Sequence, residues 1–380
     1  MRVCDVVMNS IWFDPRVNRQ ISEYMKDPEV ELTCVGLMDN RHDASKIKAY
    51  GCPITIVEKP AKYNKKLRTP IGKIIRENII IGLIADAIMK NRPDIIHAND
   101  LDALRPAMLA AKTLKCKVVY DAHEIYVENP NLKNNYLYRK YLEIHERRLI
   151  KKVSLMVSVS HGAAEYFAKK YGIKPMVITN CALRQERPLG DAEKAAGFEV
   201  LNHGAFSAGR GYELCASAGP YLKDYPDIQV VIRGLGSYEA VIRQAIIDSH
   251  SEKNVRMAPP VTVQELIPMA ARSHVGVAIT EPICLNFMLS VSNKLFEYAA
   301  AGLPVIMSDI PEHRYLNKKY NFGIIIQENT PKALAEAAIQ LYSDQALYVK
   351  YRENALRLAE ELNWEAEFAR LLDAEKNMTG

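Results

Sequence analysis

The sequence lacks the cysteine patterns that mark zinc sites and disulfide-stabilised secreted domains. Its seven cysteines are scattered along 380 residues, no two of them form a C-x-x-C pair, and their number is odd. Zinc sites and small secreted domains both need cysteines at short, recurring spacings. We therefore expect reduced thiols in a cytoplasmic setting, most of them serving as small buried hydrophobes.

Long apolar runs are also missing. No segment approaches the roughly 18 uninterrupted apolar residues of a membrane-spanning helix. The first residues, MRVCDVVMNS, lack the apolar stretch of a signal peptide. Positive charge is in small excess only. The formal net charge of +5 is too mild to indicate nucleic-acid binding by itself. A chain of 380 residues is, however, long enough for two domains with proper cores.

Strand and helix signals alternate along the chain in two series, and this alternation predicts parallel, doubly wound sheets. Strands are expected at 3–8, 31–38, 53–58, 94–98, 117–122, 155–160 and 177–181, and again at 199–204, 228–234, 255–259, 275–279, 305–309 and 322–327. The predicted fold class is therefore α/β with two Rossmann-like domains. We place the N-terminal domain at 1–185 and the C-terminal domain at 199–360, followed by a C-terminal helix at 361–380.

The segment SNKLFEYAAAGLPVIMSD, residues 292–309, predicts a helix followed by a short buried strand. Small polar residues open the helix, apolar residues recur at helical spacing, and Gly302 marks its end. A helix start collects unpaired amides and partial positive charge, which suits a phosphate. Lys294 adds a full charge there, and Glu297 lies one turn further on, in reach of sugar hydroxyls. The alternative is an ordinary capped helix with an exposed lysine and glutamate.

This segment resembles the donor-site segment of the family-four retaining glycosyltransferases, which have the GT-B fold. In that family the segment binds the diphosphate and ribose of a nucleotide-sugar. The resemblance implies two Rossmann-like domains that face each other across a cleft, with the C-terminal helix crossing back to the N-terminal domain. It also implies that Lys294 contacts the diphosphate and that Glu297 contacts the ribose.

Three other stretches agree with this resemblance in the same order along the chain. In VVYDAHEIYVE, residues 118–128, DAHE resembles the motif whose histidine faces the transferred sugar, which places His123 in the active site. The alternative is a structural histidine at a strand end. In LNHGAFSAGRGYELC, residues 201–215, Gly204 lets the backbone approach a ligand and Arg210 is suited to phosphate oxygens.

The third stretch is the first loop, NSIWFDPRVNR, residues 9–19, which borders the acceptor site in the resembled family. Asp14 is expected to contact the acceptor, and Arg16 to position a charged group. The alternative is an aspartate N-cap and a structural ion pair. Family members often carry glycines in this loop, but this chain has none.

The resemblance carries over a full set of candidate site residues. The nucleotide-sugar-binding residues are Gly204, Ser207, Gly234, Pro260, Ser292, Asn293, Leu295 and Glu297; the acceptor residues are Asp14 and Arg16; and the catalytic residues are His123, Arg210 and Lys294. UDP or GDP is the expected nucleotide. The sequence does not distinguish uracil from guanine, because contacts to the base through main-chain groups leave little trace in a sequence.

Two positions depart from the family pattern. Ala205 stands where an arginine is usual, and Leu289 stands where many members carry a second glutamate. The leading interpretation is a glycosyltransferase that moves a sugar from a nucleotide-diphosphate sugar to a glycan or lipid-linked glycan in cell-surface polysaccharide synthesis. Two alternatives remain: a non-catalytic nucleotide-sugar-binding subunit of a glycan-assembly complex, and a nucleotide-sugar epimerase of the same fold.

No cofactor and no metal are expected. Asp100 and Asp102 form a D-x-D pattern, but they follow a strand and open a helix, where aspartate is a common cap. A membrane surface is a further expected partner, because residues 59–76 mix basic and apolar side chains and contain no acidic residue. We expect peripheral attachment to the inner membrane face, against the alternative of a solvated basic loop. The residues assigned to this contact are Lys62, Lys65, Lys66 and Arg68.

Overall fold

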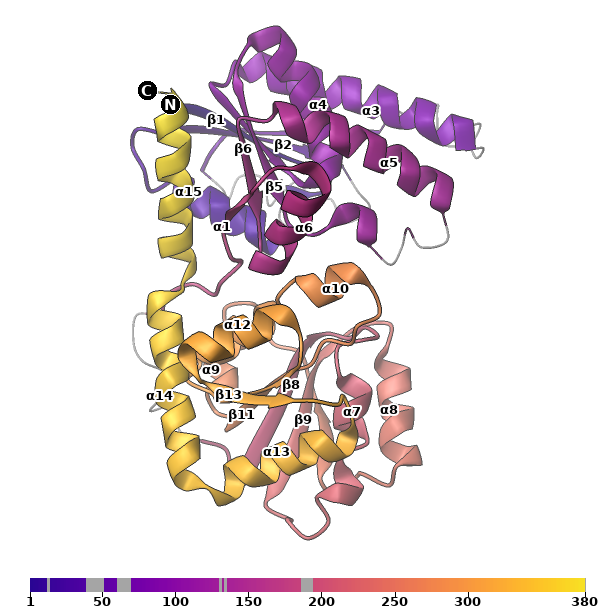
Figure 1. The fold of residues 1–380 in the computed structure, drawn as a ribbon, viewed down its shortest axis with the longest axis vertical. Helices are drawn as coiled ribbons and strands as arrows, with labels where there is room; N and C mark the ends of the chain where they lie inside the picture. The colour runs from indigo at the N-terminus through magenta and orange to yellow at the C-terminus, as the bar shows by residue number, and fades with distance from the viewer. Residues whose placement is uncertain are drawn as a thin grey trace. The chain divides into compact units, whose positions relative to one another are not determined.

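The structure is a computed structural model, and it describes residues 1–11, 14–38, 51–59, 70–129, 132, 135–185 and 194–379. The chain divides into two compact units (Figure 1). Unit 1 comprises Met1–Thr179 and Glu367–Gly380, and unit 2 comprises Asn180–Ala366. The basic residues Lys62, Lys65, Lys66 and Arg68, assigned above to a membrane contact, lie outside the described residues.

The described part of unit 1 forms a parallel sheet with the strand order β3-β2-β1-β4-β5-β6-β7. Its strands are β1 (Arg2–Val7), β2 (Glu31–Leu37), β3 (Ile54–Val57), β4 (Ile95–Asn99), β5 (Lys117–Ala122), β6 (Leu155–Ser158) and β7 (Met176–Val177). Its helices are α1 (Pro15–Tyr24), α3 (Pro70–Asn91), α4 (Asp100–Leu114), α5 (Tyr136–Leu149) and α6 (His161–Tyr171). Strand β4 is buried along its whole length, as expected for a central strand covered on both faces.

The last helix, α15 (Trp364–Thr379), packs on unit 1 through its residues from Glu367 onward. The rings of Phe368 and Tyr24 meet edge to face at 4.7 Å, and the Glu375 carboxylate lies 2.9 Å from Nδ1 of His97. This confirms the expected crossing of the C-terminal helix to the N-terminal unit.

The described part of unit 2 forms a second parallel sheet, with the order β10-β9-β8-β11-β12-β13. Its strands are β8 (Phe198–Ala205), β9 (Ile228–Leu235), β10 (Val255–Ala258), β11 (Val275–Ala278), β12 (Val305–Ser308) and β13 (Gly323–Ile326). Its helices are α7 (Tyr212–Ala216), α8 (Glu239–Asp248), α9 (Leu266–Ala270), α10 (Leu285–Leu289), α11 (Asn293–Ala300), α12 (Pro311–Tyr320), α13 (Pro331–Ser343) and α14 (Gln345–Glu361). The two sheets confirm the α/β class with two Rossmann-like units.

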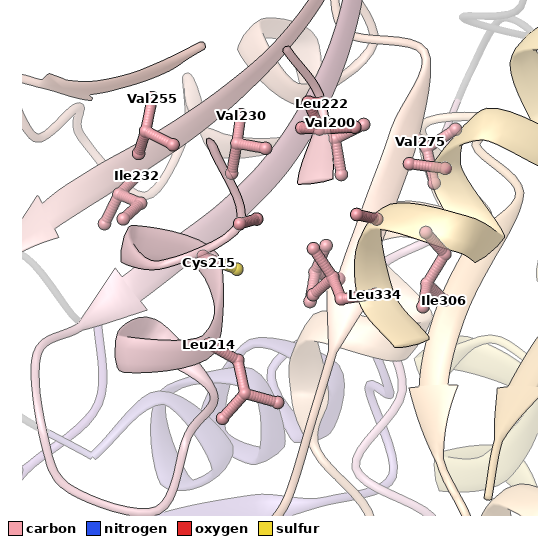
Figure 2. Packing of buried hydrophobic residues seen from close by; sticks show 14 of the residues in the cluster. Val200, Leu214, Cys215, Leu222, Val230, Ile232, Val255, Val275, Ile306 and Leu334 are labelled. Atoms are coloured by element: carbon pink, nitrogen blue, oxygen red, sulfur yellow. The ribbon is translucent and has the colours of Figure 1, made fainter. Parts of the chain in front are cut away.

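Alternate residues of the unit 2 strands supply two separate cores, because successive side chains of a strand point to opposite faces. Val200 and Val230 belong to the cluster that includes residues of α7, α8 and α13. Their neighbours Leu201 and Val231 belong to the other cluster, with α9, α11 and α14. Figure 2 shows the first cluster, where strand side chains such as Val230 and Val275 lie with Leu214 and Cys215 from α7 and Leu334 from α13.

Several predicted elements are shorter in the structure, for identifiable reasons. The strand expected at 177–181 ends at Val177, and the Thr179 amide donates instead to the carboxylate of Glu367 in α15 (2.6 Å). The segment QELIPMAARS, residues 264–273, predicts a helix, but the observed α9 spans only five residues, with Pro268 in its middle, where a proline removes a donor. The sequence also predicts a helix around 212–221, but the observed α7 ends at Ala216, before Gly219, where an added Cβ would lie 2.5 Å from Cα of Ser251.

None of the described helices is long and apolar enough to span a membrane.

Candidate active site

The candidate site residues of unit 2 gather where β8 and β9 end, at the edge where parallel α/β sheets bind ligands. Gly204 and Gly234 pair across these two strands and have φ values of 123° and 153°. A Cβ built on Gly234 would lie 1.9 Å from the Gly204 carbonyl oxygen, so this position requires glycine. At these two glycines the ends of β8 and β9 therefore present only backbone atoms.

The side chain of Lys294, in the first turn of α11, lies beside Gly204. Its Nζ donates to Oδ1 of Asn202 (2.7 Å) and to the hydroxyl of Tyr212 (3.2 Å), and it lies 4.3 Å from the centre of the Tyr212 ring. Burial, helped by the nearby Arg210 charge, lowers the pKa of Lys294 to about 7. Within the described residues no carboxylate forms an ion pair with Lys294. The amino group of Lys294 therefore contacts two neutral oxygens and an aromatic ring, and in its charged form it can bind an anion.

Arg210 is a second cation of the same kind. It lies in the turn between Gly209 and Gly211, and its guanidinium stacks 4.0 Å from the centre of the Phe287 ring. A Cβ on Gly211 would lie 2.5 Å from Cβ of Ile279, so the turn needs glycine to pack there. Burial lowers the pKa of Arg210, and in the described part of the chain no carboxylate forms an ion pair with it.

Glu297 lies on the same helix as Lys294, one turn further on, and its Oε2 is 2.9 Å from Nε2 of His203 at the end of β8. His203 is fully buried and stacks on the ring of Tyr298 at 4.6 Å. The Glu297 side chain keeps 21% of its surface exposed. One carboxylate oxygen thus anchors the side chain, and the residue remains accessible to a polar ligand.

The remaining candidates in unit 2 are placed unevenly. Ser207 is exposed in the turn after β8, Pro260 is exposed just after β10, and Ser292 and Asn293 lie at the start of α11. Leu295 differs: it is fully buried in the core, and its amide donates to the Ser292 carbonyl (3.1 Å). Neither the side chain nor the amide of Leu295 is open to a ligand, and its expected contact with the nucleotide-sugar stays a prediction without support from the structure.

In unit 1, His123 lies directly after β5 and is held from several sides. Its amide donates to Asp100 (2.9 Å), and its Nδ1 lies 3.5 Å from the other Asp100 oxygen. Its Nε2 lies 3.0 Å from Oδ1 of Asn99, whose amide nitrogen donates to Asp5 and to the Val6 carbonyl. Because the Asn99 oxygen accepts, Nε2 of His123 carries a proton.

Charge also surrounds His123. Burial opposes its positive form, but the carboxylates of Asp100 and Asp121 outweigh burial and raise its pKa to about 9. Its side chain is 14% exposed. His123 is therefore a fixed, protonated imidazole at the end of a strand, able to donate a hydrogen bond and poorly suited to accept a proton near neutral pH.

The two acceptor candidates, Asp14 and Arg16, make the contacts expected in the alternative interpretation, an aspartate N-cap and a structural ion pair. Asp14 caps α1 by accepting from the amides of Arg16 and Val17, and its Oδ2 lies 3.8 Å from Nδ1 of His123. Arg16 is 2% exposed, and its guanidinium binds both oxygens of Asp121 at 2.8 and 2.9 Å. The acceptor role of both residues stays a prediction, and the burial of Arg16 makes any effect on an acceptor an indirect one.

The D-x-D pair has local duties in the structure. Asp100 accepts from the His123 amide, and Asp102 accepts from the amide of Ala103 (2.9 Å). Among the residues that the structure describes, no group of three or more histidine, cysteine or acidic residues is arranged to hold a metal ion. Asp100 has a φ of 66°, a left-handed conformation that costs energy for a residue other than glycine.

Comparisons with known proteins match both units. The sequence profile described as Glycosyltransferase Family 4 matches residues 16–182, and the profile described as Glycosyl transferases group 1 matches residues 192–358. Together they span most of the chain, in the order of the two units. The chain belongs to the family 4 glycosyltransferases. It is therefore a glycosyltransferase that uses a nucleotide-sugar donor.

Solved structures show the fold of this family 4 glycosyltransferase. Anabaena HepE in complex with UDP is 14% identical, with a TM-score of 0.74 over 99% of this chain and 100% of that one. Sucrose-phosphate synthase from Thermosynechococcus elongatus is 13% identical, with a TM-score of 0.78 over 100% and 99%. A Listeria monocytogenes structure described as a UDP-N-acetylglucosamine 2-epimerase is 14% identical, with a TM-score of 0.64 over 99% and 96%. These likenesses show the GT-B fold. No curated protein matches the chain in sequence.

Several residues that build the candidate site of this glycosyltransferase were not predicted. In unit 2 these are Asn202, His203 and Tyr212, which hold Lys294 and Glu297. In unit 1 they are Asn99 and Asp121, which contact His123. The sequence offers one usable signal: Asp121, Asn202 and His203 lie in the last three positions of predicted strands, and Asn99 directly follows one.

Proposed function

We propose that this family 4 protein is a retaining glycosyltransferase that binds a UDP- or GDP-sugar through unit 2 and transfers the sugar to a glycan or lipid-linked glycan. The observation that carries the proposal is the pair Lys294 and Arg210, two half-buried basic side chains that form no ion pair with any described carboxylate. A lysine and an arginine without a carboxylate partner suit the diphosphate, whose negative charge favours their charged forms and grows as the bond to the sugar breaks.

The proposed division of labour follows from what each side chain can offer. Lys294 and Arg210 stabilise the leaving diphosphate, while Glu297 accepts from a ribose hydroxyl with the oxygen that His203 leaves open. His123 donates to the sugar. A base on the protein is not required in this scheme, because the departing phosphate takes the proton of the acceptor hydroxyl, and the new bond forms on the face from which the nucleotide leaves.

Metal independence belongs to the proposal, because the two cations and the start of α11 supply the positive potential at the diphosphate. We also propose that residues 59–76 attach the protein to an anionic membrane face, an idea that rests on the sequence alone.

The proposed function can be tested by incubating the purified protein with UDP-, GDP- and dTDP-sugars and a lipid-linked glycan mixture in buffer containing EDTA. We expect release of one nucleoside diphosphate, and a product whose anomeric configuration, read by NMR, equals that of the donor. A new nucleotide-sugar isomer would instead indicate an epimerase. Donor binding without release would indicate a non-catalytic subunit, and activity that returns only with magnesium or manganese would contradict metal independence.

A second experiment tests whether His123 acts on the transferred sugar and not on the diphosphate. His123→Ala should lower kcat about 10–150-fold, the equivalent of one charge-assisted hydrogen bond of roughly 1.5–3 kcal/mol. Affinity for the free nucleoside diphosphate, measured by calorimetry, should not change, because the proposed partner of His123 is the sugar. His145→Ala is the matched control, since that histidine lies on α5 and packs beside Tyr141 of the same helix. Equal losses of rate and affinity in His123→Ala would show that His123 only supports the fold.

A further inference from the structure

Two cysteines of unit 1 lie in direct contact. Sγ of Cys34, in β2, is 3.8 Å from Sγ of Cys52, which lies two residues before β3. The amide of Cys34 donates to the carbonyl of Pro53 (2.9 Å), and β2 and β3 continue as a parallel pair beyond this point. The two backbones are therefore fixed side by side where the sulfurs meet.

The two thiols differ in access and in acidity. Cys34 is 1% exposed, whereas Cys52 is partly exposed. The hydrogen bond between the sulfurs lowers the pKa of Cys52, and the same bond, together with burial, raises the pKa of Cys34 well above its usual range. The thiolate is the nucleophilic form of cysteine. Cys52 is thus suited to attack an external disulfide, and Cys34 is placed to react with the sulfur of Cys52 afterwards.

We propose that Cys34 and Cys52 are a thiol–disulfide exchange site, which forms a reversible internal disulfide by reaction with a small-molecule disulfide of the glutathione class. The proposal does not depend on the transferase activity. It adds to the expectation that most cysteines serve as small buried hydrophobes, because two of the seven cysteines scattered along the sequence are in contact in the fold.

The exchange proceeds in two balanced steps. The Cys52 thiolate attacks one sulfur of oxidised glutathione, a mixed disulfide forms, and one glutathione thiolate leaves. Cys34 then loses its proton and attacks the Cys52 sulfur, and the second glutathione leaves. The two protein thiols are oxidised, the external disulfide is reduced to two thiols, and the two protons end on the departing glutathiones.

The position of the bond connects it to the loop before α1. Three residues after Cys34, the amide of Leu37 donates to the carbonyl of Asn9 (3.1 Å). A Cβ on Gly36 would lie 2.9 Å from Cγ1 of Ile11, so β2 packs closely on the segment that leads to Asp14. The internal disulfide would fix the edge strand β3 to the strand that supports this segment, and we expect the oxidised protein to melt at a higher temperature.

The test uses the full-length reduced protein in buffers of graded oxidised-to-reduced glutathione ratio, followed by intact mass and peptide mapping. We expect the loss of two hydrogens and a linked pair of peptides containing Cys34 and Cys52, reversed by dithiothreitol. Cys34→Ser should instead retain glutathione on Cys52, because the second step is missing. Cys52→Ser should show neither the link nor an adduct on the buried Cys34.

Cys116→Ser is the matched control, since Cys116 is also partly exposed and lies apart in sequence from both strands; it should oxidise as the wild type does. Circular dichroism of each variant establishes that it is folded. Glutathione adducts on Cys116 or Cys284 without a Cys34–Cys52 link in the native protein would overturn the proposal, as would a link that forms only in urea.

Discussion

Replacing Lys294 with methionine will weaken the binding of a nucleoside diphosphate about 10–150-fold, which corresponds to the roughly 1.5–3 kcal/mol of a charge-assisted hydrogen bond. Methionine keeps the apolar stem beside the Tyr212 ring and removes the charge together with the two hydrogen bonds that Nζ donates. No described carboxylate loses a partner when Lys294 is replaced, because its Nζ contacts the neutral oxygens of Asn202 and Tyr212. The loss should therefore appear in the affinity while the fold remains intact, and transfer should be nearly abolished.

Calorimetry with UDP and GDP measures this effect, and Lys332→Met provides the control. Lys332 lies on α13 of the same unit and pairs with Glu336 at an exposed surface, so its replacement should leave affinity unchanged. If Lys294→Met binds both nucleotides as tightly as the wild type, the assignment of the diphosphate to α11 is wrong.

The same residue predicts a pH dependence with a definite sign. The pKa of Lys294 is lowered to about 7 in the free protein, and a bound diphosphate favours the charged form and raises that pKa. Binding therefore takes up a proton at pH values above about 7, and affinity should fall by up to about tenfold per unit as the pH rises further. Lys294→Met should lose this dependence, which calorimetry in buffers of different ionisation enthalpy can detect.

Much of the fold was predictable because buried parallel strands have a strong local pattern. The segments around β4, β5 and β9 are short apolar runs bounded by charged or breaker residues, and each formed a strand near its predicted position. The helix α11 and its end were also predictable, since Gly302 takes a positive φ of 67° after the last turn. The short helix α10 was missed, because five residues carry too little periodicity to be recognised.

The candidate site was predictable only where one segment carries it. Lys294 and Glu297 lie on one helix, so a single stretch of sequence indicates both. Their partners Asn202 and His203 come from β8, more than 90 residues earlier in the chain, as the separations of 92 and 94 show. Such pairings depend on which strand lies beside which helix, and a single sequence does not contain this information. For the same reason the sequence left open whether Arg16 positions a charged group or forms a structural ion pair, and the fold pairs its guanidinium with Asp121.

Asp121 is the centre of a buried polar cluster in unit 1, defined by Arg16, Gln20, His97, Asp121 and Glu375. Its carboxylate accepts from Arg16 and from Gln20 (2.7 Å), and Nε2 of His97 lies 3.4 Å away. The other nitrogen of His97 faces Glu375 of α15 at 2.9 Å. Burial opposes the charge of Asp121, but the Arg16 guanidinium outweighs burial and holds the pKa of Asp121 well below its usual range. Asp121 thus joins the first helix, the central strands and the last helix of the unit.

Asp121→Asn should lower the free energy of unfolding of unit 1 by about 3–5 kcal/mol, the cost of leaving a buried charge without its partner. The replacement keeps the shape of the side chain, so the loss comes from Arg16 and His97 rather than from a cavity. Because the folded pKa of Asp121 lies below the unfolded value near 3.9, the stabilisation is complete above about pH 4 and is lost only as the pH falls through the folded pKa. The difference from the wild type should therefore persist from neutral to mildly acidic pH.

Hydrogen exchange at increasing urea concentrations distinguishes the two units, which a single unfolding curve would merge. Protection of β4, β5 and α15 should fall in Asp121→Asn, while protection of β8 and β9 in unit 2 should remain. Asp94→Asn is the matched control, because Asp94 pairs with Arg2 at the surface, with side chains 38% and 47% exposed, and solvent screens such pairs strongly. It should leave exchange almost unchanged. Equal protection of unit 1 in Asp121→Asn and in the wild type would mean that the buried cluster adjusts without this charge, and that α15 is held by apolar contacts such as Phe368 against Tyr24.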